Sequence, residues 1–213
     1  MEQAGRIIAT HKHRRIETPT TQFKHLTSPT HIGGMSLKNR MVMSPTTTAY
    51  CNDDQTPSER LIRYFEERAK GGVGLITMEL ITVDETHRYM HRSMTLGHDR
   101  FIDDHRRVTD RIHQHGAKVQ PQLSHTGPES VAPMFGGPQP VGPSVSIAPV
   151  WGWASRELDV GELPEIARLY GEAARRAREA GYDGIELHGA HCYNLLASFL
   201  SPQRNKRTDD YSA

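Results

Sequence analysis

Cysteine is scarce in this sequence: only Cys51 and Cys192 occur among 213 residues. Two thiols can provide neither a disulfide framework nor a four-cysteine metal site. We therefore expect a protein of a reducing, cytoplasmic compartment. Long hydrophobic runs are also lacking, since no stretch of eighteen or more apolar residues is present. This absence argues against a helix that crosses a membrane.

An excess of charge of either sign is missing as well. The 26 Lys and Arg side chains nearly balance 25 Asp and Glu side chains, which leaves a net charge of +1. Nucleic acids and anionic membrane surfaces select basic patches, so we expect neither as a partner. The first 22 residues are polar and lack the apolar core of a secretory signal. They are predicted to form a polar tail ahead of one domain over residues 23–213.

What is present is an alternation of short apolar runs and amphipathic segments. Strands are expected over residues 41–43, 73–78, 117–123 and 182–187. Between them, helical spacing predicts helices from about 57 to 70, 101 to 115 and 163 to 180. For the first helix, Thr56 is the expected N-cap, with Pro57 at the first position and Glu59 closing a capping box. The residues between 125 and 158 are rich in proline and glycine and predict a long loop.

Strands that alternate with helices indicate βαβ units and a parallel sheet. This pattern alone does not separate an open doubly wound sheet from a closed barrel. The glycine-rich GxGxxG motif of dinucleotide-binding sheets does not follow the first strand, which weakens that alternative. In a barrel, the chemistry lies at the carboxyl ends of the strands.

The strand ends carry specific motifs between Asn39 and Tyr211. They read NRMVMSP, ERAKGGVGLITME, QLSHTG and IELHGAHCYNLLASFLSPQRNKRTDDY. Together they resemble the old yellow enzyme family of flavin-dependent ene-reductases. The resemblance implies the N-terminal half of an incomplete (β/α)8 TIM-type barrel, with about four βα units. The segment HIGGMSLKNR resembles the hairpin that closes the bottom of that barrel.

The same resemblance implies FMN as the bound cofactor, with NADH or NADPH as the electron donor. The strand-end residues that match the family's flavin contacts are Ser44, Pro45, Thr46, Thr47, Leu80 and Gln122. The amide of Gln122 suits the alternating donors and acceptors of the flavin's pyrimidine edge. Thr47 occupies the position that carries the covalent flavin link in the amine-dehydrogenase branch, so covalent attachment is not expected.

The final motif supplies the expected catalytic residues. His188 and His191 match the pair that holds the carbonyl oxygen of the substrate, and Tyr193 matches the proton donor. This chemistry needs hydrogen-bond donors where negative charge develops, and an acid that is still protonated at neutral pH. The HxxH spacing could also suit a metal, but no third ligand accompanies it, so no metal site is predicted. Trp151 and Trp153 in the long loop could line the substrate entrance or anchor the loop.

The matching family continues beyond the point where this chain ends. A (β/α)8 barrel has eight strands, and its usual phosphate site follows strands seven and eight. We therefore expect a second chain or self-association to complete the barrel of an FMN-dependent NAD(P)H ene-reductase-like oxidoreductase. Its small-molecule substrate is expected to be an enone or enoate. The alternatives are oxidative N-demethylation of a small methylated amine, and a catalytically silent remnant or interaction module.

Overall fold

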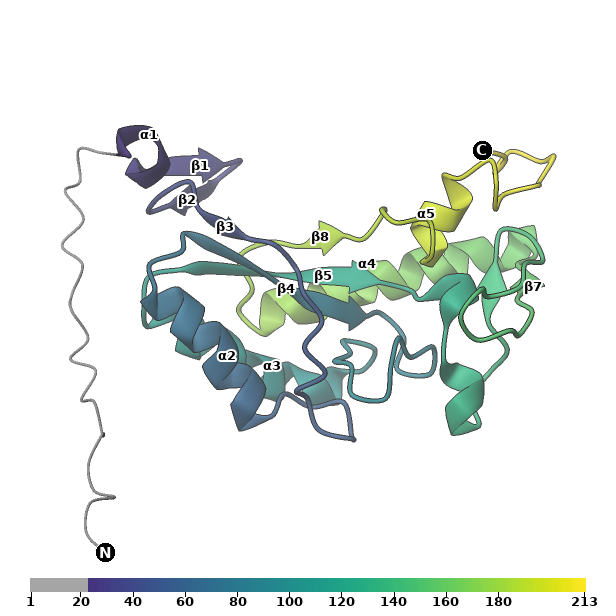
Figure 1. Ribbon diagram of the computed structural model, residues 1–213, viewed down its shortest axis with the longest axis horizontal. Helices are drawn as coiled ribbons and strands as arrows, with labels where there is room; N and C mark the ends of the chain where they lie inside the picture. The colour runs from purple at the N-terminus through teal and green to yellow at the C-terminus, as the bar shows by residue number, and fades with distance from the viewer. Residues whose placement is uncertain (1–22) are drawn as a thin grey trace, which may run out of the picture.

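The computed structural model describes residues 23–213 (Figure 1), so the predicted polar tail over residues 1–22 lies outside the described residues. The described chain begins with a short helix, α1 (Lys24–Thr27), and an antiparallel hairpin. The hairpin joins β1 (Thr30–Ile32) to β2 (Met35–Leu37). It lies beside the start of β5 and the residues just before β8, where Ile32 and Lys118 line the same cavity. The HIGGMSLKNR segment thus forms a hairpin at the amino ends of the strands.

The centre of the molecule is a curled sheet of four parallel strands. They are β3 (Val42–Met43), β4 (Leu75–Thr82), β5 (Lys118–Ser124) and β8 (Glu186–Leu187), and they pair in chain order. Three long helices alternate with them: α2 (Glu59–Lys70), α3 (Ile102–His113) and α4 (Leu163–Glu179). This order confirms the predicted partial (β/α)8 barrel with four βα units.

The three helices pack on one face of the sheet and enclose the main apolar core (Figure 1). Ile76, Met78, Val119 and Leu123 supply the strand side of this core. The opposite, concave face carries several polar side chains. There the Gln120 amide donates to Thr77 Oγ1 at 3.0 Å, and the Gln122 amide donates to Glu186 at 2.8 Å. An apolar face against helices and a polar face toward the barrel interior is the arrangement that leaves room for a ligand.

The start of α2 differs from the prediction. Ser58, not Thr56, is the N-cap, because its hydroxyl accepts a hydrogen bond from the Leu61 amide at 3.1 Å. The Thr56 hydroxyl is engaged in the preceding turn, where it donates to Asp54 at 2.6 Å. For α4 the predicted start at about residue 163 is confirmed. A 3₁₀ turn, η4 (Val160–Glu162), precedes the α-helix and is capped by Asp159.

The strand β4 is longer than predicted and contains a bulge. Its register against β5 shifts between Thr77 and Leu80, opposite Pro121. Proline has no amide hydrogen to give to the ladder, so an irregularity at this position costs little. The sequence predicted that this strand ends at residue 78, so that Glu79 and Leu80 would follow it. In the structure both residues lie within β4. β8 is shorter than predicted because Tyr182 and Asp183 turn toward α3, bonding to His105 and His113.

The long loop lies at the carboxyl ends of the strands, on the right of Figure 1. It contains two 3₁₀ turns, η2 (Gly127–Glu129) and η3 (Ala132–Phe135), and two short strands, β6 (Val141–Gly142) and β7 (Arg156–Glu157). Another 3₁₀ turn, η1 (Asp99–Phe101), precedes α3, and α5 (Leu195–Phe199) follows β8. Within residues 23–213, every helix is too short or too polar to cross a bilayer.

Candidate active site

The three residues predicted to be catalytic lie together just after β8. The His188 amide donates to Leu123 O at 3.0 Å, which keeps this residue in line with the strand. The Tyr193 hydroxyl lies 2.8 Å from His188 Nε2. The His191 ring stacks on Tyr193, with 5.7 Å between the ring centroids and an angle of 4° between the planes. The structure therefore brings His188, His191 and Tyr193 into one cluster.

An unusual turn makes this cluster possible. His191 and Cys192 adopt left-handed backbone conformations, with φ of 65° and 55°. Each such residue costs about 1–2 kcal/mol, and strain of this kind gathers at functional sites. Asn194 holds the turn from both sides: its side chain accepts from the Ala197 amide at 3.0 Å and donates to Ala190 O at 3.2 Å. The turn carries Tyr193 back to His188.

Burial adjusts the acidity of the cluster. Burial, together with the neighbouring His191, lowers the pKa of His188. Burial and the neighbouring Tyr89 raise the pKa of Tyr193. At neutral pH His188 is therefore uncharged and Tyr193 is protonated. The pair offers neutral hydrogen-bond donors and one transferable proton.

The loop after β3 holds four of the predicted flavin contacts, from Ser44 to Thr47. It is anchored at the next residue, where the Thr48 amide and hydroxyl both donate to Glu79 Oε2 at 2.7 Å. Glu79 is fully buried, and burial raises the pKa of its carboxyl. No hydrogen bond joins Thr46 or Thr47 to another of the described residues. The loop is thus held in place while its own donors are available to a ligand.

Leu80 and Gln122, the other two predicted flavin contacts, are partners in the register of β4 and β5. The Gln122 amide nitrogen is occupied by Glu186, a neighbour that sequence reasoning missed. Its carbonyl oxygen remains free to accept a hydrogen bond from an imide N–H, such as that of a flavin ring. These polar and apolar groups fit an isoalloxazine, and the FMN contacts of all six residues stay predictions.

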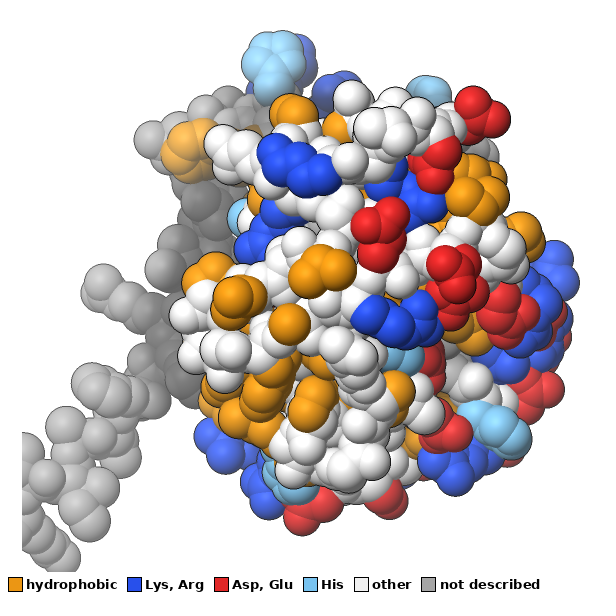
Figure 2. Space-filling view, turned by 90° about the vertical axis from the view of Figure 1, so that its right-hand side faces the viewer, with side chains coloured by type: hydrophobic (Ala, Val, Ile, Leu, Met, Phe, Trp, Pro, Cys, Tyr) orange, Lys and Arg blue, Asp and Glu red, His pale blue; other side chains and the backbone are white. Residues whose placement is uncertain are grey.

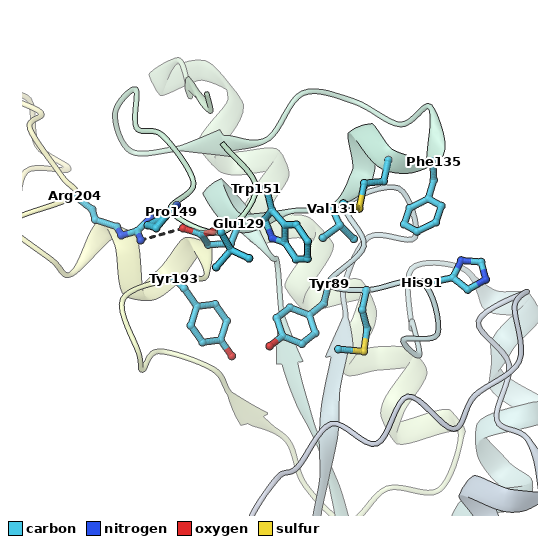
Figure 3. A pocket seen from close by; sticks show the side chains of 12 residues that line it. Tyr89, His91, Glu129, Val131, Phe135, Pro149, Trp151, Tyr193 and Arg204 are labelled. Atoms are coloured by element: carbon cyan, nitrogen blue, oxygen red, sulfur yellow. Dashed lines mark hydrogen bonds and ion pairs between the residues drawn. The ribbon is translucent and has the colours of Figure 1, made fainter. Parts of the chain in front are cut away.

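A cavity of about 560 Å³ opens next to Tyr193 (Figure 3). Figure 2 views the face that carries the long loop, and hydrophobic side chains gather on it. The cavity is lined by Tyr89, Met90, His91, Glu129, Val131, Met134, Phe135, Pro149, Val150, Trp151, Tyr193 and Arg204. Sequence reasoning proposed Tyr193 and Trp151 for this region and missed Tyr89, Glu129 and Arg204. Tyr89 and Glu129 belong to no motif, and Arg204 lies within the final motif but at a position to which that motif assigned no role.

The two tryptophans of the long loop have different positions. Trp151 lines the cavity, and its ring stacks on Trp153 with 6.0 Å between centroids. The Trp153 indole N–H donates to Ser130 O at 3.2 Å, which fastens the loop to itself. Trp153 thus anchors the loop, whereas Trp151 lines a cavity whose use as a substrate entrance stays a prediction.

Asp84, His87 and His125 form a second polar cluster, with potential ligand atoms within 4.8 Å of one another. The fold assembles it from two strand ends. His87 Nδ1 bonds to Asp84, and His125 Nδ1 accepts from the Gly127 amide at 3.1 Å. The neutral His125 ring therefore carries its hydrogen on Nε2, which is buried and has no partner among the described residues. A metal needs a lone pair at that position, so this bonding does not prepare the cluster for a metal.

Comparison with known proteins places the chain in a class. The model of the NADH:flavin oxidoreductase / NADH oxidase family matches residues 25–212. The chain belongs to this family of FMN-dependent oxidoreductases, which confirms the resemblance seen in the motifs.

Individual relatives agree with this assignment. The chain is 39% identical over 192 residues to NADH oxidase of Thermoanaerobacter brockii, covering 90% of this chain and 29% of that protein. It is 36% identical over 196 residues to cinnamate reductase of Clostridium sporogenes, covering 89% and 30%. The solved structure of the old yellow enzyme homologue from Zymomonas mobilis superposes with a TM-score of 0.82 at 30% identity, covering 88% of this chain and 54% of that one. The chain thus spans less than a third of these two relatives and about half of the solved structure.

Proposed function

We propose that this chain is the N-terminal half of an FMN-dependent, NAD(P)H-driven reductase of C=C bonds conjugated to a carbonyl group. The observation that carries the proposal is the neutral His188–Tyr193 pair, with His191 stacked beside it, at the edge of an apolar cavity. An enone or enoate needs donors at its carbonyl oxygen and a proton at its α carbon. This cluster contains both.

Each group has a separate role in the proposed reaction. FMN, when bound, supplies a hydride to the β carbon of the substrate. His188 and His191 donate hydrogen bonds to the carbonyl oxygen, where negative charge develops; losing one such donor typically costs about 10²–10³ in rate. Tyr193 then gives its proton to the α carbon, a contribution of about 10²–10⁴ for general acid catalysis. The lowered pKa of His188 keeps that ring uncharged, so it polarises the carbonyl without transferring its own proton.

The shape of the cavity supports an aromatic or otherwise planar substrate. Tyr89 lies next to Tyr193, with 5.9 Å between stacked ring centroids, and Trp151 forms a further wall (Figure 3). Aromatic walls favour flat, apolar groups. The relative named cinnamate reductase is consistent with a conjugated aryl compound as substrate.

The FMN phosphate is proposed to bind outside this chain, on a second polypeptide, a second copy or a continuation of the same protein. The phosphate normally sits at a helix N-terminus or a nest of backbone amides, and in barrels of this type it follows strands seven and eight. We expect the 24.0 kDa chain alone to lose FMN during gel filtration and to retain it when the other half is present. Stoichiometric FMN on the monomer would contradict this.

Activity is tested on the FMN-loaded, completed protein under anaerobic conditions. After reduction by NADPH or NADH, cyclohexenone is expected to reoxidise the flavin. Tyr193→Phe should slow this oxidative step about 10²-fold or more while reduction by the nicotinamide is unchanged. Tyr211→Phe is the matched control, because Tyr211 is an exposed tyrosine outside the cluster. Bleaching of the oxidised flavin by trimethylamine, with no response to the enone, would instead establish amine demethylation.

A further inference from the structure

A partly buried ion pair interrupts the apolar wall of the cavity. Arg204 Nη2 lies 3.0 Å from Glu129 Oε1, and both groups line the cavity beside Tyr193. The side chains are only 21% and 10% exposed, respectively. Figure 3 shows the pair at one end of the cavity, with the rings of Trp151, Tyr89 and Tyr193 next to it. A desolvated ion pair of this kind is costly unless all of its donors are satisfied.

The donors of Arg204 are not all satisfied. A guanidinium has five N–H donors in a planar fork. The Nη2 group donates to Glu129, whereas Nη1 is buried and has no partner among the described residues. A buried charged donor without an acceptor is unfavourable, and rotation of the guanidinium toward a ligand acceptor in the cavity would remove that penalty.

The charge around the cavity favours an anionic acceptor. Glu129 neutralises Arg204, but a second guanidinium, that of Arg88, lies 5.5 Å from the ring centroid of Phe135, which also lines the cavity. Within residues 23–213, Arg88 forms no ion pair with a carboxylate. Among the lining residues one guanidinium faces one carboxylate, and Arg88, which does not line the cavity itself, adds a second positive charge beside the Phe135 wall. Carboxylates pair with guanidinium in a planar, bidentate geometry that neutral acceptors do not match.

We propose that Arg204 binds a carboxylate of the substrate, and that the substrate is an aryl carboxylic acid whose ring lies between Tyr89 and Trp151. This carboxylate serves recognition and is separate from the carbonyl held by His188 and His191. The inference deepens the proposed function and rests on it for the reacting group. The binding step itself can be measured without FMN or turnover.

The test measures the dissociation constants of para-carboxybenzalacetone and of its methyl ester for the chain by isothermal titration calorimetry. These two compounds share the aryl enone and differ only in the anionic group. We expect the acid to bind at least about tenfold more tightly than the ester, the usual value of a charge-assisted hydrogen bond. Arg204→Met keeps an apolar stem in the wall and should abolish this preference. Arg168→Met, which removes an exposed arginine of α4 paired with Glu165, is the control and should leave it unchanged.

A second variant covers the case in which Arg204→Met does not fold. Glu129→Gln removes the competing carboxylate from Arg204 and should strengthen binding of the acid several-fold, with little effect on the ester. Equal affinity for acid and ester in the unaltered chain would overturn the inference, as would weaker binding of the acid by Glu129→Gln. If the acid binds as expected but the completed protein reduces no enone, the proposed function fails and the carboxylate site stands. If the completed protein reduces enones but shows no preference for the acid, the carboxylate site fails and the proposed function stands.

Discussion

Gly127, at the start of the long loop, packs against the backbone of Leu195, two residues after Tyr193. Replacing Gly127 with alanine should reduce both the stability of the fold and ligand binding beside Tyr193. Gly127 has a φ of 60° at the start of η2. A Cβ atom there would lie 2.6 Å from the Leu195 amide nitrogen and 2.7 Å from Leu195 Cα. The Leu195 amide also donates to His125 O at 3.0 Å. Because the clash is with backbone, a side-chain rotation cannot relieve it.

The expected loss of stability has two parts. The left-handed conformation costs alanine about 1–2 kcal/mol. Forcing an extra carbon into a packed region costs a further 1–3 kcal/mol or so. Gly136→Ala separates the parts, because Gly136 has a φ of 69° but an added Cβ would meet nothing within 4 Å. Gly127→Ala should therefore lose about 2–5 kcal/mol, and Gly136→Ala about 1–2 kcal/mol.

Urea unfolding followed by far-ultraviolet circular dichroism measures both free energies. In thermal unfolding, each kcal/mol corresponds to roughly 2–4 °C for a chain of this length. Since the backbone of Leu195 must move, Gly127→Ala should also weaken ligand binding at the Tyr193 cavity, and Gly136→Ala should not. Equal destabilisation by the two substitutions would refute the steric argument.

Two carboxyl groups should make stability depend on pH in opposite directions. Burial raises the pKa of Glu79, so its contribution is present below about pH 4 and lost as pH rises through the folded-state pKa. Glu79→Gln keeps an acceptor for Thr48 and should unfold at higher urea than the unaltered chain at pH 8, but not at pH 4; lower stability at pH 8 would contradict this. Burial opposes ionisation of Asp183 too, but hydrogen bonds from His113 and Lys118 outweigh it and lower its pKa to about 2. Asp183→Asn should therefore be less stable at pH 7, with the difference shrinking as pH falls from about 4 toward 2, and a difference independent of pH would speak against the assignment.

Much of the fold follows from local patterns that act over a few residues. The apolar runs at β4 and β5 and the glycines that end the helices predict a parallel α/β arrangement, because such strands are buried on both faces. The motif around His188 and Tyr193 pointed to the end of β8 as the candidate site. Local chemistry did not decide between Thr56 and Ser58 as the N-cap of α2. Both hydroxyls can cap a helix, and the competing Asp54 carboxylate engages the first.

The sequence by itself thus determined the alternation of elements, the family and the catalytic candidates, because periodicity and a contiguous motif are one-dimensional. Only the tertiary structure decided which distant side chains meet. Arg204 and Glu129 are 75 residues apart, and nothing in either neighbourhood indicates their contact. The stacking of Tyr89 on Tyr193 likewise joins the loop after β4 to the turn after β8. Parallel strands bring their carboxyl ends to one edge whatever their separation in the chain, so the wall of the cavity is set by packing and not by spacing.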